Sequence, residues 1–179
     1  MVLGFDGSYR RDATALIGCT LDGHLFVVDV WERPADAPAD WTVPRREVDA
    51  KLAEAMDNYE VIELACDPPG WHREIAEWGE TYEQVVVLFE TNRPREMAPA
   101  CDRFRSGVLE GGLTHEGDPT LARHVANCVV RESSSGIVIT KPDPTRKIDA
   151  AVAAVVAFER AMWHAQNPFD VPWVEVISR

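Results

Sequence analysis

The sequence contains no apolar run that approaches the roughly 20 residues a membrane-spanning helix needs. Residues 1–7 also lack the basic start and the long apolar stretch of a signal peptide. The phosphate-binding patterns GxxxxGKS and GxxxxGKT, typical of many ATPases, do not occur. We therefore expect a cytoplasmic chain that makes no membrane contact and carries no such ATPase loop.

Cysteine is scarce, and no two cysteines form a CxxC pair: Cys19, Cys66, Cys101 and Cys128. Three of the four lie in apolar segments, where a thiol is usually buried and reduced. We therefore expect structural thiols rather than a zinc site.

Basic residues are also in deficit, with 18 Lys and Arg against 30 Asp and Glu and a net charge of -12. Affinity for nucleic acid normally comes from Lys and Arg that neutralise phosphates, so the charge argues against tight DNA binding. A site for divalent cations must itself be acidic, however, and a domain tethered to another DNA-gripping part needs little affinity of its own. Weak nucleic-acid binding by the isolated chain is therefore expected.

The 179 residues, 46% hydrophobic and 27% charged, fit one folded domain over residues 1–179. Strand-like runs at 2–5, 13–19 and 25–31, the last two separated by Asp22-Gly23, indicate an antiparallel meander. The succession of strand 61–66, helix 71–78 and strand 85–89 then indicates parallel pairing with a right-handed crossover. The remaining expected elements are helices near 48–56, 94–109, 120–126 and 147–163, and a more exposed hairpin of strands 128–131 and 137–141. The sequence therefore predicts a mixed α/β fold.

Three aspartates stand at the ends of expected elements. Asp6 ends the first strand, Asp67 ends the fourth, and Asp149 lies in the first turn of the last helix. If the first and fourth strands are parallel neighbours, their carboxyl ends share the sheet edge where ligand sites form. Each aspartate also fits a local role: Asp6 in a turn, Asp67 in a loop before two prolines, and Asp149 as a charge favoured by the helix dipole.

Three carboxylates in one cleft repel each other unless a cation neutralises them. Their hard oxygen atoms select Mg²⁺ or Mn²⁺ rather than zinc. Two such ions about 3.5–4 Å apart can align a nucleophile and stabilise a leaving oxygen. The pattern therefore predicts phosphodiester hydrolysis.

The same placement resembles the ribonuclease H-like nuclease superfamily, and within it the nuclease domain of phage terminase large subunits. The motifs that carry the resemblance are GFDGS at 4–8, DATA at 12–15, ACDPPGW at 65–71 and KIDAAVA at 147–153, with further likeness over 102–119 and 123–127. These motifs cover most of the chain, in the order and spacing of the family.

The resemblance implies a mixed five-stranded sheet flanked by helices, with an extra late hairpin. It also implies that Asp6, Asp67 and Asp149 are both the catalytic residues and the ligands of two Mg²⁺ or Mn²⁺ ions, with no organic cofactor. The implied activity is an endonuclease that cuts concatemeric double-stranded viral DNA during packaging in the cytoplasm of the infected host cell. The implied partners are a packaging ATPase domain, the terminase small subunit and the portal. Because the family carries its ATPase at the amino end and Met1 stands five residues before Asp6, we expect a domain excised from a longer chain.

Other polar residues fit less specific roles. Asp12 fits a turn better than an outer-shell carboxylate, and Asp143, a rival for Asp149, lies in a loop between two prolines. His115 and His124 are expected at the surface or in helix packing, with a ligand or catalytic role as the alternative. We expect basic residues to gather on the cleft side, with scattered solvated charges as the alternative: Arg10, Arg11, Arg131, Lys141, Arg146 and Lys147.

Three rival interpretations stay open from the sequence. A fragment of an actin-like or sugar-kinase fold also places Asp-Gly-Ser after a first strand, but 179 residues leave little room for the second subdomain that it needs. A non-catalytic binding module of the same fold would suit the acidic charge. Another ribonuclease H-like enzyme, such as a resolvase or a transposase, would share the three acids.

Overall fold

The first three strands form an antiparallel meander, as predicted. In the computed structural model, which describes residues 1–8 and 13–168, β1 (Val2–Gly7) pairs with β2 (Thr14–Cys19), and β2 pairs with β3 (His24–Trp31). Gly23 turns the chain between β2 and β3 with a φ of 89°, a left-handed conformation that glycine adopts at little cost. Every residue of β2 is buried, so the meander lies at the centre of the sheet.

The parallel half of the sheet is also as predicted. The strand β4 (Glu63–Cys66) pairs parallel to β1, with Val2 opposite Glu63 and Phe5 opposite Cys66. The helix α2 (His72–Thr81) then leads to β5 (Val86–Leu88), which pairs parallel to β4. The expected strand-helix-strand crossover is therefore confirmed.

Over residues 1–8 and 13–168 the sheet has six strands, one more than the five predicted. The additional strand, β6 (Thr114–His115), pairs parallel to the start of β3, giving the order β5-β4-β1-β2-β3-β6. Two residues are too few to show the alternation that marks a strand in a sequence. No local pattern in the sequence therefore indicates β6.

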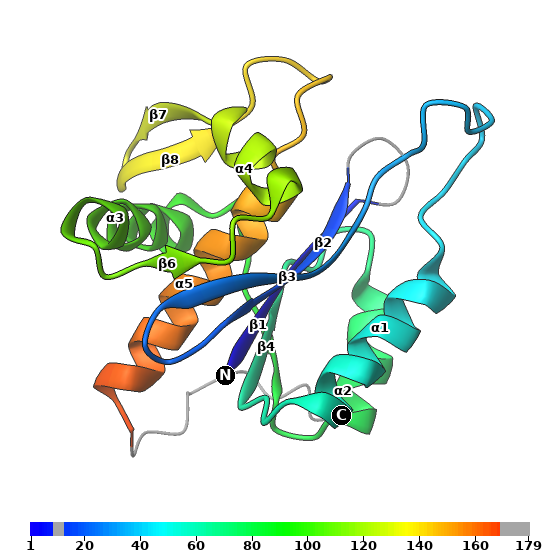
Figure 1. Ribbon diagram of the computed structural model, residues 1–179, viewed down its shortest axis with the longest axis horizontal. Helices are drawn as coiled ribbons and strands as arrows, with labels where there is room; N and C mark the ends of the chain where they lie inside the picture. Colours follow the sequence, from blue (N-terminus) through cyan, green and yellow to red (C-terminus); the bar gives the residue numbers. More distant parts are fainter. Residues whose placement is uncertain (9–12, 169–179) are drawn as a thin grey trace.

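Helices cover both faces of the sheet (Figure 1). One face packs against α1 (Arg45–Asn58) and α2 through a cluster that includes Leu3 and Phe5. The other face packs against α5 (Asp149–Gln166), with α3 (Pro94–Glu110) and α4 (Pro119–Ala126) beside it. Because successive side chains of a strand point to opposite faces, Val2 joins the α5 side while Leu3 joins the α1 side.

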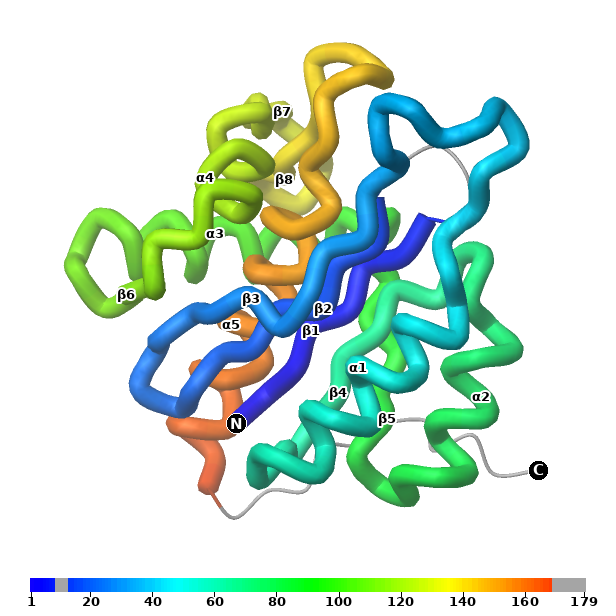
Figure 2. Tube along the Cα trace, turned by 45° about the vertical axis from the view of Figure 1, so that its right-hand side comes forward, coloured from blue at the N-terminus to red at the C-terminus, as the bar shows by residue number. Residues whose placement is uncertain are grey.

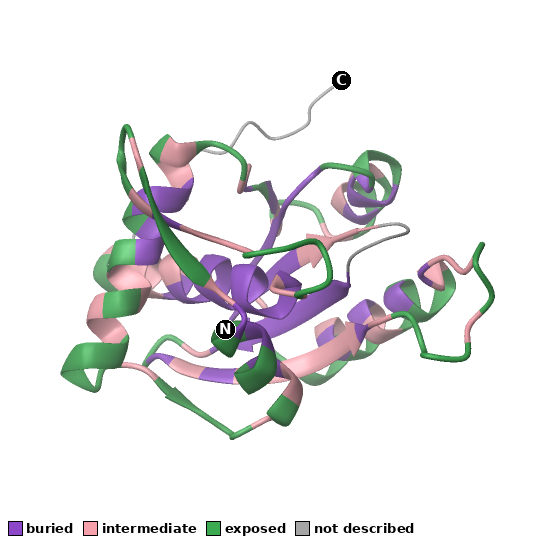
Figure 3. Ribbon diagram, turned by 90° about the horizontal axis from the view of Figure 1, so that it is seen from above, coloured by how far each residue is buried: buried purple, intermediate pink, exposed green. Residues whose placement is uncertain are grey.

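The sheet is buried from both sides, and its exposed residues are concentrated at its margins. The central strands are mostly buried, whereas the outward faces of the helices are exposed (Figure 3). The late hairpin, β7 (Val129–Ser133) and β8 (Gly136–Thr140), forms a separate two-stranded sheet near α3 and α4 (Figure 2). All residues of β7 except Ser133 are exposed, as expected for this hairpin. In the part of the chain that the structure describes, no helix is both long and apolar enough to cross a bilayer.

Candidate active site

Asp6 and Asp67 stand next to each other at the carboxyl ends of β1 and β4. The register of these parallel strands ends with Phe5 opposite Cys66, so the next residue along each strand is an aspartate. The backbone N–H of Asp67 donates to the carbonyl oxygen of Phe5 at 2.9 Å, which ties the two strand ends together. The sheet therefore brings together two acids that are far apart in the sequence.

Asp149 lies at the same end of the molecule. The helix α5 runs antiparallel to β1, because Gly4 approaches Ala153 while Gly23, at the opposite end of the sheet, approaches Phe158. Asp149 opens this helix one turn before Ala153 and is only 8% exposed. The three predicted acids therefore share one end of the fold.

The carboxylate of Asp67 is enclosed and held in place. It is 8% exposed, and Thr91 donates to it twice, from its N–H to Oδ1 at 3.1 Å and from its hydroxyl to Oδ2 at 2.9 Å. Burial raises the pKa of Asp67, while the two hydrogen bonds from Thr91 act in the opposite direction. A cation bound here would also favour the charged form, so the buried carboxylate suits a metal ligand.

The acids do not form a closed cation cage. Within residues 1–8 and 13–168, no group of three His, Cys, Asp or Glu side chains is arranged to hold a metal ion. The donor chemistry and the shared location fit Mg²⁺ or Mn²⁺, but the metal assignment stays a prediction.

The structure gives the rival residues ordinary local roles. Asp143 is exposed in a turn, where its Oδ1 accepts the N–H of Thr145 at 2.8 Å. The hydrogen bonds from Thr145 hold the pKa of Asp143 below its usual value. His115 is exposed in β6 and accepts the N–H of Gly117 at Nδ1, 3.0 Å away. Asp12 lies outside the described residues.

His124 is a packing residue, one of the two roles expected, and it is completely buried. Its side chain is 0% exposed, and both of its ring nitrogens have hydrogen-bond partners, Glu32 and the backbone of Ala150.

Thr91 was not singled out from the sequence. Its position two residues after the expected strand 85–89 places it at the same sheet edge as Asp67. This position could have been read from the sequence.

The structure describes four of the six basic residues expected around the site: Arg131, Lys141, Arg146 and Lys147. Arg10 and Arg11 lie outside the described residues. Arg146 donates to Oδ1 of Asn127 at 3.2 Å, and Lys147 stands two positions before Asp149. A cavity of about 160 Å³ beside Thr91 is lined by α3, the late hairpin and α5, with Arg131 at its wall. A basic surface that holds DNA stays a prediction.

Known proteins resemble the chain in both sequence and structure. Residues 45–165 match the family described as terminase large subunit, endonuclease domain. Gene 13 protein of Mycobacterium phage L5 and that of Mycobacterium phage D29 are each 38% identical over 172 residues, which cover 88% of this chain. The chain spans only 28% of the length of these two relatives.

Solved structures agree in fold. The large terminase of bacteriophage HK97 superposes with a TM-score of 0.69 at 25% identity, covering 88% of this chain and 38% of that protein. The large terminase nuclease of the thermophilic phage G20c, solved with bound magnesium, gives a TM-score of 0.64 at 16% identity and covers 89% of this chain and 80% of its own. The chain therefore belongs to the family of terminase large subunit endonuclease domains.

Proposed function

We propose that this chain is a metal-dependent endonuclease that cuts concatemeric double-stranded viral DNA during genome packaging. The observation that carries the proposal is the location of Asp6, Asp67 and Asp149 at one end of the fold, in a member of a nuclease family. We assign these three residues as the ligands of two Mg²⁺ or Mn²⁺ ions. The large terminase nuclease of phage G20c was solved with bound magnesium, which supports the choice of metal.

The three acids would divide the metal ligation unequally. The strand β1 pairs with β4 and packs against α5, and from this arrangement we infer that Asp6 lies between Asp67 and Asp149. We therefore expect Asp6 to contribute to both ions, Asp67 to one and Asp149 to the other. When bound, such ions would supply an activated nucleophile and stabilise the leaving oxygen of a phosphodiester.

Thr91 would keep the Asp67 carboxylate in one orientation. Its N–H and hydroxyl engage the two different oxygens, which restricts rotation of the carboxylate. A ligand that is held before the cation arrives loses less conformational freedom on binding. Thr91 would thus orient the ligand without binding the metal itself.

The rest of the longer protein would supply most of the affinity for DNA. Because the chain spans 28% of its relatives, we propose that the natural protein also contains a packaging ATPase domain. We further propose that it acts with the terminase small subunit and the portal, in the cytoplasm of the infected host cell. Tethering would hold this acidic domain near DNA at a high effective concentration.

Asparagine variants test the proposal in a plasmid-nicking assay with Mn²⁺ or Mg²⁺. Asp6→Asn should abolish cleavage of supercoiled plasmid because both ions lose a ligand, and Asp67→Asn should nearly abolish it. Asp149→Asn should leave a trace in high Mn²⁺. The matched control is Asp143→Asn, in the exposed turn, which should cut at the wild-type rate. If all three site variants cut like the wild type, the activity is a contaminant or the site lies elsewhere.

A non-catalytic module of the same fold that binds DNA or another protein is the second candidate. The net charge of -12 does not help a nuclease hold DNA, and no three-residue metal group is formed among the described residues. The same assay separates the two functions, because a binding module of either kind would leave supercoiled plasmid uncut at every Mn²⁺ or Mg²⁺ concentration, without producing nicked or linear DNA.

A further inference from the structure

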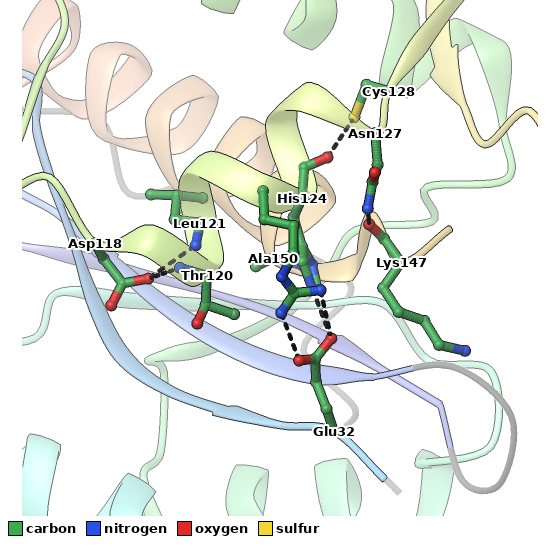
Figure 4. A network of polar contacts seen from close by, with 10 residues as sticks. Glu32, Asp118, Thr120, Leu121, His124, Asn127, Cys128, Lys147 and Ala150 are labelled. Carbon is green, nitrogen blue, oxygen red and sulfur yellow. Dashed lines mark hydrogen bonds and ion pairs between the residues drawn. The ribbon is translucent and has the colours of Figure 1, made fainter. Parts of the chain in front are cut away.

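The first turn of α5 is capped from outside its own segment. The first N–H groups of any helix have no acceptor within the helix, and Ile148, at the N-cap, has no polar side chain to offer. Instead the N–H of Ala150 donates to Nδ1 of His124, 2.9 Å away (Figure 4). His124 belongs to α4 and is completely buried, so this cap is a tertiary contact adjacent to Asp149.

The hydrogen bonds of His124 define its tautomer. Because Nδ1 accepts the N–H of Ala150, the ring proton of the neutral imidazole lies on Nε2. Nε2 then donates to Oε1 of Glu32 at 2.9 Å. Glu32 directly follows β3, so the imidazole links the end of a central strand to the start of α5.

Glu32 is itself held in its charged form. Arg123 donates to its two carboxylate oxygens at 3.2 and 2.6 Å. Burial acts to raise the pKa of Glu32, but the hydrogen bonds from Arg123 and His124 outweigh it and keep the pKa below its usual value. The imidazole of His124 therefore donates to a charged Glu32 carboxylate that Arg123 holds in place.

The residue that follows α4 holds the backbone just before Asp149. Asn127, the C-cap residue of α4, lies three positions after His124, and its amide donates to the carbonyl oxygen of Lys147 at 2.9 Å. The helix α4 is itself capped by Asp118, whose Oδ1 accepts the backbone N–H groups of Thr120 and Leu121 in the first turn at 2.8 Å each. We call His124 and Asn127 the α4 bracket, since they form hydrogen bonds with the backbone on both sides of Asp149.

We propose that the α4 bracket is a positioning device, in which His124 and Asn127 set the place of Asp149 and thereby the metal affinity of the site. The inference rests on the proposed function, because it takes Asp149 as a metal ligand. Neither residue contacts the reacting groups in this assignment. Both act through the backbone of the segment that carries the ligand.

Two substitutions of His124 separate the two ring nitrogens. In His124→Asn the side-chain oxygen replaces Nδ1 and can still accept the N–H of Ala150, but the contact with Glu32 is lost. In His124→Gln the amide nitrogen replaces Nε2 and can still donate to Glu32, but Ala150 loses its acceptor. Both variants remove the imidazole ring, so they share the general cost of disturbing a buried site.

Mn²⁺ titration calorimetry and amide hydrogen exchange provide the measurements. We expect His124→Gln to lose about tenfold in Mn²⁺ affinity, the low end for residues that orient metal ligands. The Ala150 amide should also exchange faster in this variant without metal. His124→Asn should recover most of the affinity and the protection. A merely structural role would instead make both variants lose affinity in proportion to their loss of thermal stability, and that result would overturn the proposal.

The controls keep the two proposals apart. A wild-type chain that binds no Mn²⁺ and cuts no plasmid overturns the proposed function and this inference with it. An active wild type with unchanged Mn²⁺ affinity in folded His124→Gln overturns the inference alone. If His124→Gln does not fold, Asn127→Ala decides: a measurable but smaller loss of affinity supports the bracket, and an unchanged affinity overturns it.

Discussion

At the scale of single residues, the environment of Asp67 depends on one neighbour. Thr91 supplies two donors to a carboxylate that is almost fully buried. A buried charge without such partners would cost several kcal/mol or would be neutralised by a proton. Thr91 therefore contributes both to folding and to the state of a candidate metal ligand.

Replacing Thr91 by valine tests this contribution. Thr91→Val keeps the shape and the backbone N–H but removes the hydroxyl donor to Oδ2 of Asp67. We expect a loss of about 1 kcal/mol in the free energy of unfolding and weaker Mn²⁺ binding, measured by urea denaturation and calorimetry. The matched control is Thr81→Val in α2, where the exposed hydroxyl bonds only to the Glu77 carbonyl oxygen. Equal effects at the two positions would contradict a special role for Thr91.

The sequence could place the acids but not the buried contact between His124 and the backbone beside Asp149. Asp6 and Asp67 were predictable because each follows an apolar strand, and strand ends are readable from local patterns. The cap that His124 gives to Ala150 joins residues 26 positions apart, and no local pattern encodes such a contact. Burial of a histidine depends on which helix faces meet, which only the folded structure shows.

At the scale of elements, α5 packs unusually close to β1. A Cβ atom at Gly4 would lie 2.3 Å from the carbonyl oxygen of Ala153 and 2.8 Å from the backbone nitrogen of Ala157. The alanine-rich face of α5 permits this approach because small side chains let the helix backbone reach the sheet. The distance between β1 and α5 therefore depends on Gly4, and with it the placement of Asp149 relative to Asp6.

Gly4→Ala should be strongly destabilising, although it adds only one methyl group. The atoms that it meets belong to helix backbone and cannot rotate away, so α5 must shift. We expect a loss of about 3 kcal/mol, at the upper end for overpacking, together with reduced plasmid cleavage. Gly79→Ala, in α2 with open space around it, should instead be neutral or gain up to about 1 kcal/mol. Comparable urea midpoints for Gly4→Ala and the wild type would contradict this packing.

Elements as short as the three-residue β5 were readable from the sequence, whereas the two-residue β6 was not. The meander, the crossover through α2, the late hairpin and α5 each have a sustained apolar period or a strong turn signal. The two-residue strand β6 has neither, because its pairing with His24 and Leu25 arises from tertiary structure. This missing signal accounts for the difference between five predicted strands and six.

For the whole molecule, the net charge of -12 limits the affinity for DNA, because the chain and the phosphates are both negative. We expect the cleavage-inactive Asp6→Asn chain to bind a double-stranded oligonucleotide with a Kd of about 10⁻⁴ M at physiological salt, the weak end of non-specific binding. Fluorescence anisotropy with a labelled duplex would measure it, and a chain that includes the rest of the natural protein should bind more tightly. Submicromolar binding by the isolated chain would contradict the proposal that another part holds the DNA.

The proposed function requires that Asp6, Asp67 and Asp149 together hold the metal ions. Anomalous diffraction from crystals of the wild-type chain soaked in Mn²⁺ tests it most directly, because Mn²⁺ scatters anomalously and the peaks locate the ions. We expect anomalous peaks between the three carboxylates, and their loss in crystals of Asp6→Asn soaked in the same way. Peaks only at other positions, from a chain that cuts plasmid in the same Mn²⁺ concentration, would contradict it.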